Sequence, residues 1–241
     1  MAGLNAARGG TLLAGGVITV WVAFSGVEAR ASEESVDHAT KFALSLDAHP
    51  DRGGPQFARY CMRCHGPQAQ GDAVRAIPAL AAQRFAYLVR QLADFAGGER
   101  DSDTMHRVVS QQEMGGPQTW VDIASFLNRL PRSGRAQSGE GARLALGRAI
   151  FREQCASCHA GDAHGDDDGF VPSLRNQHYT YLLGQMHKLG QGSRHNVDEN
   201  LARFLGNFDD EDMQAIADYL SRLRGPGAVH PVMRLDGLVV D

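Results

Sequence analysis

Cys61-Met62-Arg63-Cys64-His65 and Cys155-Ala156-Ser157-Cys158-His159 are the two stretches of sequence that decide the fold. Both follow the pattern C-x-x-C-H, the attachment sequence for c-type haem. The two thiols add to the vinyl groups of the porphyrin, and the adjacent histidine is placed to bind the iron. We therefore expect two covalent haem c groups per chain, with His65 and His159 as proximal ligands.

The alternatives for a single C-x-x-C are a thioredoxin-like redox pair or half of a zinc site. The chain contains four cysteines, and both motifs together use all of them. Structural zinc needs further ligands at regular spacing, and no cysteine remains to supply them. Two pairs in register, each followed directly by histidine, favour haem.

The two motifs belong to a tandem duplication. At an offset of 94 residues, the two halves align without a gap over about forty positions. The matched pairs include Pro78 with Pro172, Gln83 with Gln177, Tyr87 with Tyr181, Gln91 with Gln185, and Arg100 with Arg194. We expect a helical extension at residues 32–48, domains at 49–131 and 141–224, a polar linker at 132–140, and an irregular tail at 225–241.

The spacing of apolar residues indicates an all-α fold. Apolar side chains recur at helical spacing in both halves, at Phe85, Leu88, Val89, Leu92 and Phe95, and at Leu182, Leu183, Met186 and Leu189. No segment shows the two-residue alternation of a strand. About 85 residues per domain bury little apolar surface unaided, so we expect a porphyrin to complete each core.

The first 31 residues have the features of a secretory signal peptide. Arg8 precedes an uncharged apolar run at residues 11–24, and Ala29-Arg30-Ala31 offers a small-x-small cleavage site. The run is short for a permanent membrane span, and a retained N-terminal anchor is the alternative. We expect export to the periplasm. The formal net charge of −4 provides no basic field for nucleic acid.

Met105 is the predicted sixth ligand of the first haem iron. It follows the turn at residues 98–100, and a thioether ligand raises the reduction potential because it favours ferrous iron. Met114 and His106 are the competing residues. Met114 is followed by Gly115-Gly116, which is typical of a loop.

The second half lacks the matching methionine. The position equivalent to Met105 falls near Glu199 or Asn200, and residues 197–207 contain no methionine. We expect His195 to bind the second iron, with two alternatives left open. One is a ligand from a helix (Met186, His187 or Met213), and the other is an open or water-bound iron.

The combined motifs resemble the cytochrome c4 family of dihaem cytochromes. They are the doubled C-x-x-C-H, the P-x-L, the Q-x-x-x-Y-x-x-x-Q-L and the G-x-R, over about 170 residues. The resemblance implies two tandem cytochrome c-like helical domains, packed about a pseudo-twofold axis with the haem propionate edges facing. It also implies that the carbonyls of Pro78 and Pro172 orient the proximal histidines, and that Arg100 and Arg194 bind propionates.

The same resemblance implies a periplasmic electron carrier of the respiratory chain. Its partners would be a quinol-oxidising complex and a terminal oxidase or reductase, with membrane association only through partners or a retained anchor. The alternative is an oxidoreductase subunit whose second haem is catalytic or ligand-binding. A thiosulfate dehydrogenase with a cysteine-ligated haem is disfavoured because all four cysteines serve attachment. Two haems, small domains and an acidic surface favour a carrier over an enzyme.

Overall fold

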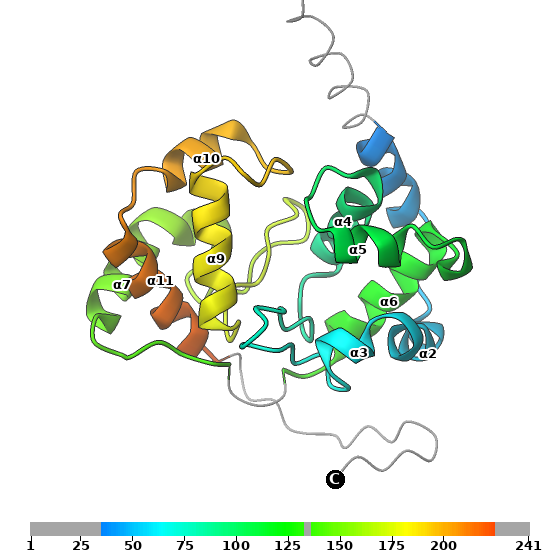
Figure 1. Ribbon diagram of the computed structural model, residues 1–241, viewed down its shortest axis with the longest axis horizontal. Coiled ribbons are helices and arrows are strands. Elements are labelled where there is room, and N and C mark those ends of the chain that lie inside the picture. The colour runs from blue at the N-terminus through cyan, green and yellow to red at the C-terminus, as the bar shows by residue number, and fades with distance from the viewer. Residues whose placement is uncertain (1–34, 133–135, 225–241) are drawn as a thin grey trace, which may run out of the picture.

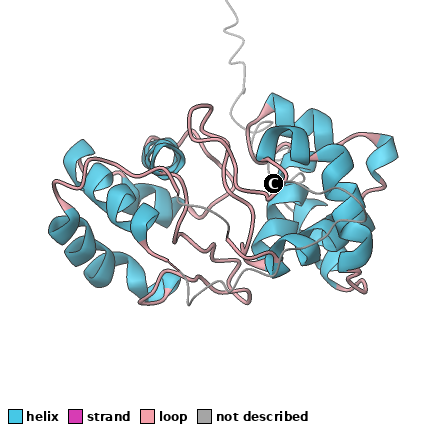
Figure 2. Ribbon diagram, turned by 90° about the horizontal axis from the view of Figure 1, so that it is seen from below, coloured by secondary structure: helices cyan, strands magenta, loops and turns pink. Residues whose placement is uncertain are grey.

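The computed structural model describes residues 35–132 and 136–224. The predicted signal peptide, part of the predicted linker and the predicted tail lie outside these residues. Within the described part every regular element is a helix, and the only β-type pairings are the isolated bridges Asp72–Ile77 and Asp166–Val171 (Figure 2). The predicted all-α class is confirmed. No helix in residues 35–132 or 136–224 is long and apolar enough to cross a membrane.

The helices form two groups that repeat the same order (Figure 1). The first group follows a helix at residues 35–44 and consists of α2 (Pro50–Tyr60), α3 (Met62–His65), α4 (Phe85–Gly97), α5 (Asp103–Val109), the 3-10 turn η1 (Gln112–Met114) and α6 (Pro117–Arg129). The second group consists of α7 (Leu144–Ile150), the π-helical turn η2 (Phe151–Cys155), α8 (Ala156–His159), α9 (Tyr179–Gly190), α10 (Glu199–Leu205) and α11 (Asp210–Arg222).

In each half, the first and last helices cross at very short distance. A Cβ atom added to Gly53 would lie 2.0 Å from the carbonyl oxygen of Asp122, and one added to Gly147 would lie 2.0 Å from that of Ala215. Only a residue without a side chain permits such an approach. Because the two glycines are 94 residues apart, the duplication encodes the same crossing twice.

The first half has the larger apolar core. The helix at residues 35–44 contributes the buried side chains of Val36 and Ala43 to it. The second core is smaller, and its buried members are Phe151, Ala163, Leu182, Ile216, Ala217 and Leu220. Small domains of this kind gain most from a large apolar cofactor.

The two halves pack through a reciprocal set of hydrogen bonds. The side-chain amide of Gln83 bonds the N–H (2.7 Å) and the C=O (3.0 Å) of Ser173. Gln177, its equivalent, bonds the N–H (2.9 Å) and the C=O (2.8 Å) of Ala79. Ala79 and Ser173 are themselves 94 residues apart, so a pseudo-twofold relation connects the two sets of contacts.

The pseudo-symmetry breaks at one matched pair beside these amides. Arg84 forms an ion pair with Asp167 of the other half at 2.7 Å. Its equivalent is His178, whose Nε2 instead bonds the carbonyl of Gln70 at 2.8 Å. His178 is buried and belongs to the interface between the halves.

Candidate functional site

Each C-x-x-C-H motif forms a short helical turn at the end of the first long helix of its half. Cys61 ends α2 and His65 ends α3, with the His65 N–H donating to the Cys61 carbonyl at 3.0 Å. In the second half Cys155 precedes α8, and His159 ends it. All four thiols are free of disulfide bonds. In each half, the local turn therefore brings two thiols and one imidazole together.

Both histidine rings are held by the same backbone contact. The Nδ1 atom of His65 lies 3.1 Å from the carbonyl oxygen of Pro78, and that of His159 lies 3.1 Å from the carbonyl oxygen of Pro172. A carbonyl only accepts, so the proton of each ring is on Nδ1 and the lone pair of Nε2 is left for a metal. Burial lowers the pKa of both histidines, which favours the neutral, ligating form.

The thiols do not suit zinc or redox chemistry. Burial, with a smaller contribution from the neighbouring thiol, raises the pKa of Cys61 to about 12 and that of Cys155 to about 11. Redox-active cysteines need a lowered thiol pKa, whereas burial keeps these thiols neutral. In addition, no group of three or more histidine, cysteine or acidic side chains in the described residues could hold a metal ion. The thiols therefore fit covalent attachment of a cofactor.

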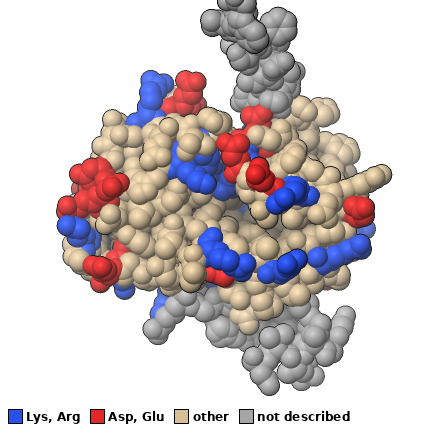
Figure 3. All heavy atoms as spheres, viewed as in Figure 1, with Lys and Arg blue, Asp and Glu red and all other residues tan. Residues whose placement is uncertain are grey.

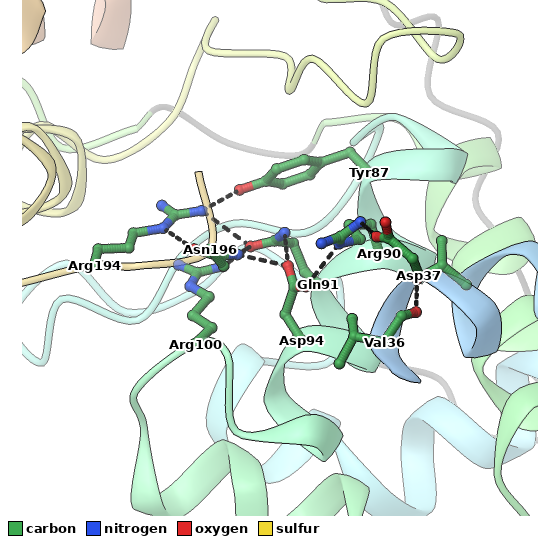
Figure 4. A network of polar contacts seen from close by, with 10 residues as sticks. Val36, Asp37, Tyr87, Arg90, Gln91, Asp94, Arg100, Arg194 and Asn196 are labelled. Atoms are coloured by element: carbon green, nitrogen blue, oxygen red, sulfur yellow. Dashed lines mark hydrogen bonds and ion pairs between the residues drawn. The ribbon is translucent and has the colours of Figure 1, made fainter. Parts of the chain in front are cut away.

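Arg100 and Arg194 lie at the centre of the contact between the halves (Figure 4). Only 8% of Arg100 and 9% of Arg194 is exposed. Nη2 of Arg100 donates to the Tyr181 hydroxyl at 2.8 Å and to Gln185 at 3.0 Å. The Arg100 guanidinium thus reaches from the first half into the second.

The matching contacts of Arg194 follow the same scheme. Its Nη2 donates to the Tyr87 hydroxyl at 3.4 Å and to Gln91 at 3.0 Å. Among the described residues, no carboxylate lies within ion-pair distance of Arg194 or Arg100. Neither guanidinium forms a direct ion pair that would offset the cost of its burial, and each guanidinium fork suits a carboxylate. The pair therefore fits the propionates of bound haem, and propionate binding stays a prediction.

A buried acid beside these arginines was not anticipated from the sequence. The carboxylate of Asp94 on α4 is completely buried and accepts hydrogen bonds from Arg90 at 2.7 Å and from Asn196 of the other half at 2.6 Å (Figure 4). Arg90 also pairs with Asp37, which fastens the N-terminal helix to α4. The i,i+4 spacing of Arg90 and Asp94 within an apolar stripe was the available signal.

Met105 lies in the first turn of α5, partly buried against the first core together with Cys61 and Leu80. Its rivals have other roles. Met114 is fully buried in that core, and Nδ1 of His106 lies 2.8 Å from the carbonyl oxygen of Phe95. Ligation by Met105 stays a prediction that this arrangement favours.

The second half places a different residue at the equivalent position. α5 and α10 are both seven-residue helices, and their third residues are Met105 and Leu201. The equivalent of Met105 is therefore Leu201, one or two residues beyond the position that the sequence predicted. The His195 side chain is exposed, and its role as ligand stays a prediction.

The comparisons with known proteins agree with the geometry. The second half, residues 144–224, matches a family model described as cytochrome c. Cytochrome c4 from Pseudomonas aeruginosa is 28% identical over 184 residues, which cover 70% of this chain and 87% of that protein. Reduced recombinant cytochrome c4 from Pseudomonas stutzeri has a similar structure, with a TM-score of 0.64 and 25% identity over 74% of this chain and 100% of that chain.

A second similar structure is an enzyme. It is a thiosulfate dehydrogenase from Marichromatium purpuratum, with a TM-score of 0.61 and 25% identity. The match covers 70% of this chain and 39% of that chain. The two-domain helical fold is therefore found both in small dihaem proteins and within a longer enzyme.

Proposed function

We propose that this chain, a homologue of the dihaem cytochromes c4 with one covalent haem c in each of two cytochrome c domains, carries single electrons between respiratory partners in the periplasm. The partners are a quinol-oxidising complex as donor and a terminal oxidase or reductase as acceptor. The signal-peptide features of residues 1–31 support export.

The observation that carries this proposal is the reciprocal interface. Gln83 and Gln177 are buried and tie each half to the backbone of the other at four points. Electron transfer between two redox groups falls steeply with their separation, so an internal relay needs a fixed distance between its groups. Buried hydrogen bonds between a side-chain amide and the backbone provide such rigidity.

The residues of the chain set the conditions for one-electron chemistry. Haem iron supplies that chemistry by changing between its ferric and ferrous states. The carbonyls of Pro78 and Pro172 make the imidazoles of His65 and His159 more basic ligands. Arg100 and Arg194 place two positive charges where the halves meet, which offsets the negative charge of propionates.

Surface charge supports recognition of a basic partner. The first turn of α11 carries Asp210, Glu211 and Asp212, and Asp209 caps it. Figure 3 shows acidic residues gathered at the outer end of the second half. Charge complementarity of this kind increases the rate of association more than the affinity.

The test uses the mature holoprotein and membranes that contain the quinol-oxidising complex. We expect quinol to reduce both haems, and a terminal oxidase to reoxidise them, with rates that fall as ionic strength rises. The double variant Cys155→Ala/Cys158→Ala should contain one haem per chain and accept half as many electrons. Haems that quinol-reduced membranes leave oxidised would contradict the carrier function.

A further inference from the structure

We propose that the second haem of this chain has no protein ligand at its sixth coordination position, and that a neutral diatomic molecule such as CO or NO binds there. The inference deepens the proposed function, since it rests on the covalent haem assigned to each half. It concerns the side chains that the second half presents where the first half presents Met105.

α5 and α10 occupy equivalent places in the two halves. Each follows a buried interface arginine, Arg100 or Arg194, and each packs against the long helix that precedes it. Each begins with a side-chain cap: Ser102 accepts from the third residue of α5, and Asp198 accepts from the second residue of α10. The helices also have equal length, and matching them from their first residues pairs Met105 with Leu201.

The correspondence puts Leu201 where Met105 lies. Leu201 is 39% exposed, which is unusual for a leucine in a helix that packs against its own domain. The other residues of α10 (Glu199, Asn200, Ala202, Arg203, Phe204 and Leu205) include no methionine, histidine or cysteine. α10 therefore offers none of the usual sixth ligands of haem iron.

The contacts of its two neighbours keep His195 away from the expected position of the second iron. Arg194 reaches the first half through Tyr87 and Gln91, and Asn196 donates to Asp94 at 2.6 Å. Both neighbouring side chains thus point into the contact between the halves. The side chain between them is exposed to solvent. A backbone movement that turned His195 toward the iron would break the bonds of Arg194 or Asn196 to the first half.

The remaining ligand candidates have structural roles. Met186 on α9 is equivalent to Leu92 on α4, and both pack against the core of their own half. His187 contacts Asp210 at 3.0 Å, and Met213 is buried in α11 with 5% exposure. Met186 and Met213 are therefore core residues, and His187 is a surface residue that contacts Asp210.

The side chains that replace the thioether select the class of ligand. Leu201 and Phe204 are apolar and give no hydrogen-bond donor or positive charge to an anion. Neutral diatomic molecules need neither, because they bind ferrous iron through the metal–ligand bond itself. In the first half, Met105 would close the same position.

The test is a CO titration of the anaerobically reduced holoprotein, followed by absorbance, with electron paramagnetic resonance of the oxidised form. We expect one CO per two haems, and one low-spin and one high-spin ferric signal. Leu201→Met should abolish CO binding and convert the high-spin signal to low-spin. The matched variant Met105→Leu should raise the count to two CO per chain.

A wild-type protein that binds no CO, or that shows two low-spin signals, would overturn the proposal. If His195→Ala or Met186→Leu then created CO binding, that residue would be the ligand instead. Electron exchange with quinol-reduced membranes is measured on the same preparation. Exchange without CO binding refutes the open position alone, and CO binding without exchange refutes the carrier function alone.

Discussion

Gln177 in the second half bonds both backbone groups of Ala79, which directly follows the proline whose carbonyl holds His65 in the first half. Gln83 makes the same arrangement with Ser173, the neighbour of Pro172. Each half therefore fastens the backbone that orients the predicted proximal histidine of the other. The interface thus supports both predicted iron ligands, His65 and His159.

We predict that Gln177→Ala alters the first haem rather than the second. It leaves two buried backbone groups without partners, at a cost of about 1–3 kcal/mol each in the free energy of unfolding. The looser Pro78 carbonyl makes His65 less basic, which favours ferrous iron and raises the potential of the first haem.

Potentiometric titration with denaturant unfolding measures both effects. Gln83→Ala should shift the second haem instead, and the exposed control Gln112→Ala should shift neither. A change confined to the second haem in Gln177→Ala would contradict the cross-domain relation.

The helix crossings should tolerate no added methyl group. Gly53→Ala and Gly147→Ala each put Cβ about 2.0 Å from a carbonyl oxygen. Overpacking of this kind costs about 1–3 kcal/mol or more, and we expect lower midpoints in thermal unfolding. Gly184→Ala on α9 is the control, because its Cβ would meet no atom within 4 Å and alanine is the better helix former. Equal effects at Gly184 and Gly147 would disprove the crossing argument.

Substitutions at Met105 and Met114 should distinguish an effect on iron ligation from an effect on core packing. We expect Met105→Ala to lower the potential of the first haem by a sizeable part of the ~0.8 V range that axial ligands control. Met114→Ala removes a fully buried side chain, so it should cost about 2–5 kcal/mol of stability and leave the potential nearly unchanged. Voltammetry and denaturant unfolding of both variants check this. The reverse result would make Met114 the ligand.

The titration of the buried Asp94 carboxyl should contribute to the pH dependence of stability. Burial raises the pKa of this carboxyl above its usual 3.8, although hydrogen bonds from Asn196 and Arg90 oppose the shift. Between the usual and the raised pKa the folded state binds more protons than the unfolded state, so the free energy of unfolding decreases as pH rises. As pH rises across that interval, Asp94→Asn should therefore gain stability relative to the parent protein. Above the interval, the difference in stability should stay constant.

Asp72 is the control of opposite sign. Arg75 lowers its pKa, so the stability that Asp72 contributes is present above pH 3.8 and is lost as pH falls through the lowered value. Its exposed position makes the effect small. Unfolding curves from about pH 2 to 7 measure Asp94→Asn and Asp72→Asn. A stability of Asp94→Asn relative to the parent that falls as pH rises through the interval would refute the predicted direction.

The sequence by itself determined the covalent chemistry and the duplication. C-x-x-C-H is a local pattern: residues one helical turn apart meet whatever surrounds them, so the roles of Cys61, Cys64 and His65 could be predicted without a fold. The constant offset of 94 residues likewise gave two helical domains, since equal sequences fold into equal elements.

Only the tertiary structure decided how the halves meet and what replaces Met105. The partners that Arg100, Gln83 and Asp94 have in the other half lie about 80 to 100 residues away in the chain, and no local pattern specifies them. The identity of Leu201 as the equivalent of Met105 depended on where α10 begins, which is set by its cap and its packing on α9.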